Sequence, residues 1–264
     1  MSSTDEKVHL YSDGPHVETQ SPPRNPSLRR RLLHRPIPAI LFLAALWIWF
    51  RAVFVHRHHY CPDKDLGSPS SSWLAQDNVE LVPLEAHIMS KCPDARDCLQ
   101  MLVLPTMANV SSKVNFTLSY IGTVDPKSDE VSCMHGPGEC LGNIIQLCAI
   151  KVYPDPKQNL GFANCMTSDY QDIPERDLVE ECAMEYGIDF DQLNACISDE
   201  GEGIDLLRAS VERSQHLGVR KSCTVRLDDK IRCIRDGGEW YDCDGGSEVG
   251  DLVADIEKLY SEYN

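Results

Sequence analysis

The chain has 264 residues, of which 42% are hydrophobic and 25% charged, and its net charge is -16 at pH 7. So acidic a chain repels nucleic-acid phosphates and anionic lipid headgroups, which excludes nucleic acid as a partner. All 12 cysteines lie at or after Cys61. This asymmetry indicates that the part of the chain after Cys61 resides in an oxidising compartment.

One strongly apolar stretch, residues 37–55, precedes every cysteine. Its single charged residue, Arg51, lies near the far end, and the stretch is just long enough to span a membrane. A cleaved signal peptide is the alternative, but the polar leader is long for an ordinary n-region and no clear small-x-small site follows. Arginines precede the stretch, namely Arg29, Arg30, Arg31 and Arg35. By the positive-inside rule we expect a single-pass type II membrane protein with its signal anchor at residues 36–55.

The rest of the chain divides by composition. Residues 1–35 predict a disordered cytoplasmic tail, and residues 56–78 predict a lumenal stem in which Cys61 could pair between two chains. Residues 79–264 have the length of one domain. Asn109 and Asn115 begin N-x-Ser/Thr sequons and are expected to be glycosylated if this domain is lumenal.

The lumenal domain begins with the pattern of an α/β sheet. Residues 79–89 predict a strand, residues 96–104 an apolar helix and residues 114–122 a second, alternating strand. Further helices are predicted at 139–153, 174–186, 189–197 and 204–217. A hairpin is then predicted at 223–227 and 230–234, followed by an amphipathic helix at 251–263. This order predicts a thioredoxin-like α/β domain with a helical, disulfide-rich insertion at about 133–217.

Cys92 follows the first predicted strand directly and precedes the first predicted helix. At such a turn, free backbone N–H groups and the positive end of the helix dipole stabilise a thiolate. Cys92 is therefore a candidate nucleophile. The alternative is an ordinary disulfide partner.

Residues 133–148 carry the most specific motif in the chain. It resembles the pattern C-Q-H-G-x-x-E-C-x-x-N-x-x-x-x-C of the gamma-interferon-inducible lysosomal thiol reductase family, with Met134 in place of Gln. The matching positions are Cys133, His135, Gly136, Glu139, Cys140, Asn143 and Cys148. The likeness extends over about residues 79–245. It implies a thioredoxin-like fold, disulfide-containing protein substrates, no cofactor, and a place in the secretory, endolysosomal or vacuolar lumen.

The motif has two interpretations as a site. Its cysteines and histidine could bind zinc, but the spacing fits no common zinc pattern and an oxidising lumen favours disulfides, so no metal is expected. We expect instead that the cysteines crosslink the insertion and that His135, Glu139 and Asn143 hold a turn by hydrogen bonds. The other cysteines are expected to be structural, with a connectivity that spacing alone leaves open: Cys165, Cys182, Cys196, Cys233 and Cys243.

The resemblance implies a C-x-x-C pair whose first thiolate attacks a disulfide and whose second cysteine resolves the mixed disulfide. In this chain the second position is Ala95, and the next cysteine is Cys98. Six helical positions correspond to about 9 Å of rise and about 120° of rotation, whereas a disulfide needs Cα atoms within roughly 7 Å. Cys98 can therefore resolve Cys92 only if residues 93–97 form a loop. Pro93 is compatible with a loop or with the first helical position.

A second departure lies before the predicted hairpin. Thioredoxin-like proteins place a cis-proline there, and this chain has Cys223, which could approach Cys92 and act as an alternative resolving thiol. The leading hypothesis is a lumenal thiol–disulfide oxidoreductase with Cys92 attacking and Cys98 as the candidate resolving cysteine. The alternative is a catalytically impaired scaffold of the secretory pathway, in which Cys92 and Cys98 form a fixed disulfide.

Overall fold

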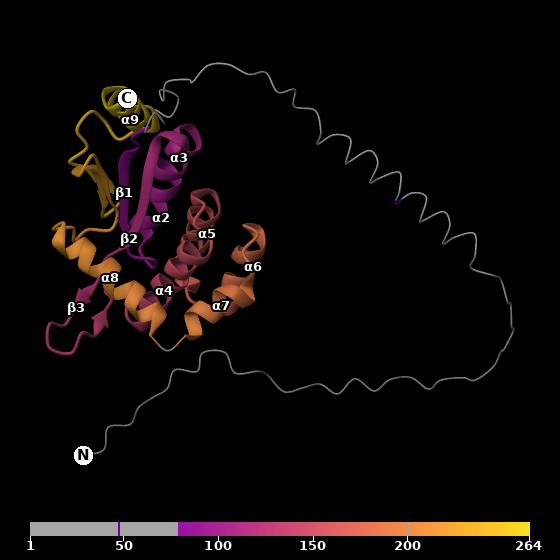
Figure 1. Cartoon of the computed structure of the whole chain (residues 1–264). Helices are drawn as coiled ribbons and strands as arrows, with labels where there is room; N and C mark the ends of the chain where they lie inside the picture. The colour runs from indigo at the N-terminus through magenta and orange to yellow at the C-terminus, as the bar shows by residue number, and fades with distance from the viewer. Residues whose placement is uncertain (1–46, 48–78, 200) are drawn as a thin grey trace, which may run out of the picture. The chain divides into compact units, whose positions relative to one another are not determined.

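The structure, a computed structural model, describes residues 47, 79–199 and 201–264 (Figure 1). In these residues no helix is both long and apolar enough to cross a membrane. Several predictions lie outside the described residues: the tail at 1–35, the anchor at 36–55 apart from Trp47, and the stem at 56–78 with Cys61.

A mixed five-stranded sheet lies at the centre of the described domain, in the order β2-β1-β5-β6-β7. The strands are β1 (Val82–Ile88), β2 (Val114–Tyr120), β5 (Thr224–Leu227), β6 (Lys230–Asp236) and β7 (Glu239–Tyr241). β1 and β2 run parallel, with Leu84 opposite Phe116, and the other neighbouring strands are antiparallel. A parallel pair needs a crossover connection, and a helical segment supplies it. The predicted thioredoxin-like α/β order is therefore confirmed.

The crossover between β1 and β2 is helical from Pro93 onward, after a turn at residues 89–92. It consists of α2 (Pro93–Cys98), a π-helical turn η1 (Leu99–Val103) and α3 (Leu104–Val110). Pro93 occupies the first helical position, where its missing N–H has no partner to lose. Pro105 also lacks an N–H, and the π turn that directly precedes it takes up the altered hydrogen bonding. The helix is thus longer at both ends than the predicted 96–104.

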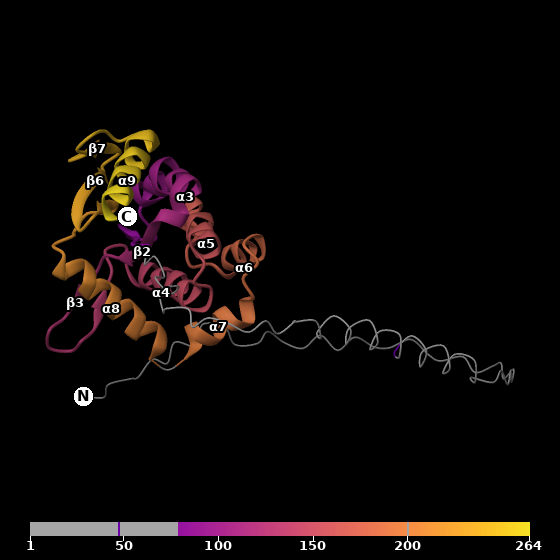
Figure 2. The ribbon, with the colours of Figure 1, turned by 45° about the horizontal axis from the view of Figure 1, so that its top comes forward.

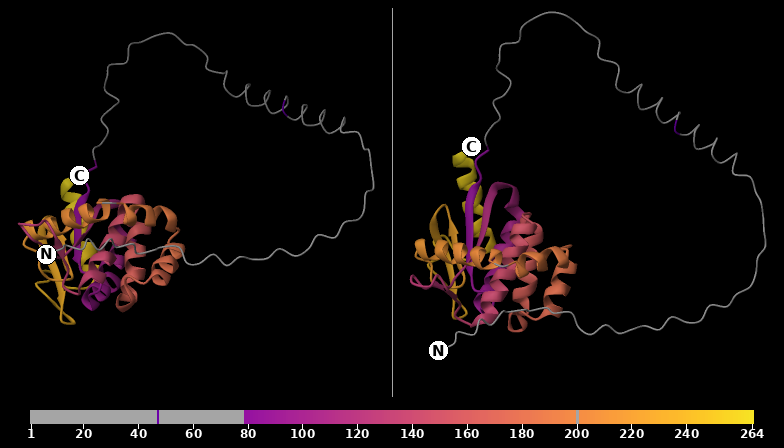
Figure 3. Two further views of the ribbon diagram at one scale, coloured as in Figure 1. Left: turned by 90° about the horizontal axis from the view of Figure 1, so that it is seen from below. Right: turned by 60° about the horizontal axis from the view of Figure 1, so that its bottom comes forward.

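Helices make up most of the insertion between β2 and β5. They are α4 (Pro137–Val152), α5 (Pro156–Ser168), α6 (Arg176–Glu185), α7 (Phe190–Ser198) and α8 (Glu202–His216), preceded by the short strands β3 (Thr123–Val124) and β4 (Val131–Ser132). Figure 3 shows these helices gathered beside the sheet. The sequence did not predict α5, although Asp155 caps it through the N–H of Lys157 and Pro156 starts it. It also placed the start of α6 at Pro174, which precedes the helix.

Disulfides crosslink the insertion, as expected. Cys148 on α4 is bonded to Cys196 on α7, with their Cα atoms 5.8 Å apart, and Cys165 on α5 to Cys182 on α6. Two further bridges close short loops, Cys133–Cys140 and Cys233–Cys243. Such bridges restrict the unfolded chain and typically contribute about 2–4 kcal/mol each.

The two faces of β1 have different chemistry. Leu84, Ala86 and Ile88 are buried on one face, and α3 and α9 (Val249–Tyr263) pack beside each other on the sheet (Figure 2). On α9, Leu252 and Ile256 supply the buried residues. Successive residues of a strand point to opposite faces, so the side chains between the apolar ones reach the face covered by α8.

That second face holds a buried polar network. Glu85 receives hydrogen bonds from Arg226 at 3.0 Å and forms an ion pair with Arg213 at 2.9 Å. His87 is fully buried, with Nδ1 2.9 Å from Ser214 Oγ and Nε2 3.1 Å from Glu85 Oε2. Burial lowers the pKa of His87 from 6.5 to about 4, although the neighbouring Glu85 carboxylate acts in the opposite direction. His87 is therefore neutral at pH 7.

We expect the free energy of unfolding to decrease as the pH falls from 6.5 to about 4, the interval between the unfolded and folded pKa of His87. In this interval the unfolded imidazole binds a proton and the buried ring does not, so stability rises with pH. One pKa unit corresponds to about 1.4 kcal/mol, which gives a loss of roughly 3 kcal/mol below the folded pKa.

Denaturant titrations of the full chain across this pH range measure the effect. His87→Gln should flatten the pH dependence, and His216→Gln, on the exposed side of α8, serves as the matched control. Equal slopes in the wild type and in His87→Gln would contradict the assignment.

Candidate active site

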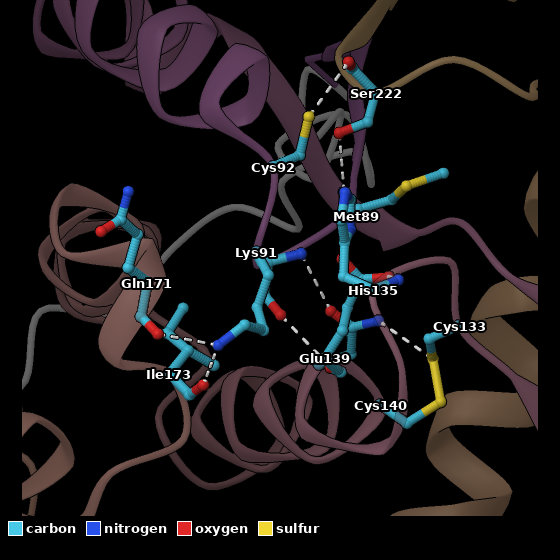
Figure 4. Close-up of polar contacts among 12 residues, drawn as sticks. Met89, Lys91, Cys92, Cys133, His135, Glu139, Cys140, Gln171, Ile173 and Ser222 are labelled. Atoms are coloured by element: carbon cyan, nitrogen blue, oxygen red, sulfur yellow. Dashed lines mark hydrogen bonds and ion pairs between the residues drawn. A yellow bond between two sulfur atoms is a disulfide. The ribbon is translucent and has the colours of Figure 1, made fainter.

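Cys92 is the last residue of the turn between β1 and α2 and has the extended conformation of a helix cap. Among the cysteines that the structure describes, it is the one in the free thiol state. Its exposed fraction is 8%. The thiol donates to the carbonyl oxygen of Ser222, with Sγ 3.7 Å from the oxygen (Figure 4). A nucleophile predicted from the sequence thus lies at the start of the crossover helix, against the segment that leads into β5.

Cys98 is bonded to Cys223, and their Cα atoms are 6.2 Å apart. Residues 93–98 are helical, so the loop that would bring Cys98 to Cys92 is absent in this state. The Cys92–Cys98 bridge of the scaffold hypothesis is absent as well. Cys223 stands at the position expected for the cis-proline of thioredoxin-like proteins, and the Ser222–Cys223 peptide bond is cis. The Cys98–Cys223 bond and the contact of Cys92 with Ser222 bring the three cysteines into one site.

Charged groups hold α2 against the β6–β7 hairpin. Asp94 accepts hydrogen bonds from the N–H groups of Gly237 and Gly238, at 2.8 and 2.9 Å. Arg235 donates to Asp97 at 3.0 Å. Burial alone would raise the pKa of Asp97, but hydrogen bonds from Arg96 and Arg235 hold it below the usual value. Asp97 is therefore ionised at neutral pH, and the first turns of the helix are fixed to the sheet.

The motif at residues 133–148, which carries the family resemblance, supports the turn before Cys92. Ser90 donates its N–H to Asn143 Oδ1 at 3.1 Å and its hydroxyl to the carbonyl of Glu139 at 3.3 Å. At Gly142, a Cβ atom would lie 2.8 Å from Ser90 Oγ and 2.3 Å from Ile173 Cγ2. Only glycine allows α4 to approach the turn this closely.

The first part of the same motif forms the turn that begins α4. The Cys133–Cys140 disulfide closes it, and Gly136 has a φ of +84°, which favours glycine. Inside it, the buried Glu139 carboxylate accepts the N–H of His135 at 3.3 Å and also contacts His135 Nδ1. These are the hydrogen bonds expected from the sequence. Cys133, Cys140 and Cys148 are in disulfides and so are not available to zinc, and the described residues contain no metal-binding cluster.

Lys91 was not singled out by the sequence, yet it fixes the same turn. Its ammonium group donates to the carbonyl of Gln171 at 2.9 Å and also to that of Ile173 (Figure 4). These carbonyls lie just before α6, in a loop with a cis Ile173–Pro174 bond. No periodicity or spacing connects Lys91 with residues so far along the chain, so only the fold brings them together.

A groove of about 600 Å³ opens beside this site. Met89, at the end of β1, lines it together with Met134, Val219 and Arg220, although Cys92 itself does not. Met89 is linked to the thiol through Ser222, whose hydroxyl accepts the Met89 N–H at 2.8 Å and whose carbonyl contacts Cys92. Met134, which replaces the family's Gln, is 74% exposed. The groove thus combines apolar side chains with a basic one, and Ser222 connects its Met89 wall to the thiol.

Residues 83–186 match the family model described as gamma interferon inducible lysosomal thiol reductase. A thiol reductase of this name from Carassius auratus is 32% identical over 98 residues, which cover 35% of this chain and 39% of the relative. GILT-like protein 1 from Drosophila melanogaster is 27% identical over 152 residues, which cover 52% of this chain and 60% of the relative. The alignments thus span less than two thirds of these relatives, and the family match ends before the hairpin that carries Cys223.

A solved structure from Nitrosomonas europaea, described as a proposed protein disulfide isomerase, has a TM-score of 0.50 against this chain. It covers 70% of this chain and the whole of that chain, at 10% sequence identity. At that identity the likeness shows the fold alone. It agrees with the thioredoxin-like architecture read from the strand order.

We expect Asn143→Ala to destabilise the chain by about 1–3 kcal/mol, because it leaves the buried N–H of Ser90 without an acceptor. The turn before Cys92 would then be less restrained, and Cys92 should react faster with iodoacetamide at fixed pH. Denaturant unfolding and mass-spectrometric alkylation rates measure the two effects. Asn194→Ala, on α7, is the matched control, and an unchanged alkylation rate in Asn143→Ala would contradict the role of Asn143 in holding the turn.

Proposed function

Because the resemblance to the gamma-interferon-inducible lysosomal thiol reductase family holds over residues 83–186, we propose that the chain is a thiol–disulfide oxidoreductase that acts through Cys92. The observation that carries the proposal is the free thiol of Cys92 at the start of the crossover helix of a thioredoxin-like fold. Its substrates are disulfide-containing proteins. The described residues need supply no cofactor for this chemistry, because thiol–disulfide exchange uses sulfur atoms alone.

The first step is attack of the Cys92 thiolate on one sulfur of a substrate disulfide. A bond forms between Cys92 and that sulfur, the substrate S–S bond breaks, and the second substrate sulfur leaves as a thiolate that takes up a proton. With Cys98 and Cys223 bonded to each other, neither is free to resolve the adduct. In this oxidised state the mixed disulfide at Cys92 should therefore persist.

The groove beside Met89 is the proposed contact for the substrate chain. Its wall includes the loop of Val219 and Arg220, which continues to Ser222 and so to the thiol. Met134 adds a flexible apolar side chain, of the kind that adapts to varied partners. We expect the bound substrate segment to be extended and apolar, with an acidic residue that forms an ion pair with Arg220.

We place the domain in the lumen of the secretory, endolysosomal or vacuolar system, held by a type II anchor at residues 36–55 and a stem at residues 56–78. The disulfides of the described domain support an oxidising compartment. Both sequon asparagines are exposed, Asn109 on α3 and Asn115 on the edge strand β2. Cys61 in the stem is proposed to allow a covalent dimer.

A scaffold without turnover is the second candidate function. Two observations favour it: the Cys98–Cys223 bond leaves Cys92 without a free partner, and Cys92 is 8% exposed. Such a protein would hold substrates through the groove, without net reduction of their disulfides. The two functions differ in whether Cys92 forms adducts.

We expect the oxidised full chain to form a stable, one-to-one mixed disulfide when incubated with oxidised glutathione, because Cys92 can attack and no second thiol can resolve. Intact-mass and peptide mass spectrometry measure the adduct. The Cys61→Ala variant is the matched control, since it removes the stem thiol and should keep the adduct. Cys61→Ala/Cys92→Ala should lose it. Absence of an adduct at Cys92 in the Cys61→Ala variant would reject the oxidoreductase and favour the scaffold.

The lumenal placement predicts glycans on Asn109 and Asn115. We expect the full chain made in eukaryotic cells to migrate faster on gels after treatment with an N-glycosidase. Asn109→Gln and Asn115→Gln should each remove part of this shift, and the double variant all of it. Thr117→Ser keeps the second sequon and is the control for that strand. A wild-type chain that is insensitive to the enzyme would contradict the proposed topology.

A further inference from the structure

Three cysteines lie at the candidate active site, and Cys223 is connected to each of the other two. It is bonded to Cys98, and the carbonyl of the preceding residue, Ser222, receives the Cys92 thiol at 3.7 Å. Cys98 and Cys223 are fully buried, whereas Cys92 reaches the surface at 8% exposure. Cys92 is therefore the one of these three residues that solvent reaches, and the Cys98–Cys223 pair is enclosed in the protein.

Helix geometry separates Cys92 from Cys98. Cys92 caps α2 and Cys98 is its last residue, so about 9 Å of rise and a different side of the helix separate them. Cys223 is held in the sheet by paired backbone hydrogen bonds with Arg235, each 2.9 Å long. Helix geometry therefore keeps the two helix cysteines apart, while Cys223 is bonded to one of them and directly follows the residue that accepts the hydrogen bond of the other.

We propose that Cys223 is the resolving cysteine of Cys92 and that it then passes the disulfide inward to Cys98. This inference rests on the proposed function, for which it names the second and third participants. Cys98 thereby takes up the disulfide as the Cys98–Cys223 bond and does not itself contact the substrate. The state seen in the structure is the end of this relay, with Cys92 free for a further attack.

The relay starts from three thiols and balances at each step. After the attack on the substrate, the Cys223 thiolate attacks Cys92 Sγ, forms the Cys92–Cys223 bond and releases the substrate sulfur as a thiolate that takes up a proton. The Cys98 thiolate then attacks Cys223 Sγ, forms the Cys98–Cys223 bond and releases Cys92 as a thiolate. The substrate disulfide gains two electrons and the three cysteines lose two. Two molecules of a small external thiol restore the reduced form in the reverse sequence: the first forms a mixed disulfide with Cys92 and leaves Cys223 as a thiol, and the second attacks that mixed disulfide, releases Cys92 and leaves as the external disulfide.

The last step is an exchange within the oxidised protein and needs no substrate, so it can be tested by itself. Oxidised wild-type full chain is incubated with a low concentration of N-ethylmaleimide, acid-quenched and mapped by mass spectrometry. We expect label on Cys98 as well as on Cys92, because Cys98 is a thiol whenever the bond is between Cys92 and Cys223. In Cys92→Ala, labelling of Cys98 should be lost. Unlabelled Cys98 in the wild type, or equal labelling in Cys92→Ala, would overturn the relay.

A pair of variants tests which cysteines can bond. After mild oxidation with diamide, Cys98→Ala should contain a Cys92–Cys223 disulfide, whereas Cys223→Ala should keep Cys92 and Cys98 as two thiols. Free Cys92 and Cys223 in the first variant, or a Cys92–Cys98 bond in the second, would overturn the proposal. The Cys165–Cys182 bridge, detected in the same digest, reports that each variant has folded. Failure of these tests with the glutathione adduct intact rejects the relay alone, whereas loss of the adduct rejects the proposed function.

Discussion

A helix that starts directly after Cys92 determines which sulfur atoms can meet in this protein. With Pro93 at the first helical position, the residue three places after Cys92 would face back toward the thiol, and here that residue is Ala95. The next cysteine lies most of two turns away, and it bonds across to the sheet at Cys223. With Ala95 at the second position of the pair, Cys92 has no cysteine partner on the first helical turn, and the helix cysteine pairs with Cys223 instead.

The family motif on α4 acts on this arrangement from outside. Its Asn143 and the Glu139 carbonyl bind Ser90, and Gly142 lets the helix approach, so α4 fixes the backbone that leads to Cys92. None of these groups contacts the sulfur of Cys92. The motif can therefore be retained in a chain whose C-x-x-C pair has changed, because its physical task is to hold a turn and does not depend on which residue resolves the thiol.

The order of elements could be predicted because each long helix and strand has its own periodicity, and the hairpin before β6 has Asp228-Asp229 at its turn. Helix α5 could not be predicted, because its polar and apolar residues are mixed and form no clear apolar face. Only the capping Asp155 and Pro156 indicate where it begins. The candidate nucleophile Cys92 followed from its position between a strand and a helix. Its neighbours did not: pairing of Cys98 with Cys223 depends on the β1–β5 contact, which no local pattern in the sequence encodes.

The contacts between α2 and the hairpin decide whether the three cysteines stay together once they are reduced. Asp94 binds the N–H groups of Gly237 and Gly238, and Asp97 binds Arg235, whose own backbone pairs with Cys223. These hydrogen bonds involve charged groups in a partly buried position, where they are stronger than neutral ones. They tie α2 to β6 and its turn, and β6 is in turn paired with the backbone of Cys223, so this link between the helix and the Cys223 segment does not depend on the Cys98–Cys223 bond. On this basis we expect the helix and the sheet to stay together when the three cysteines are reduced.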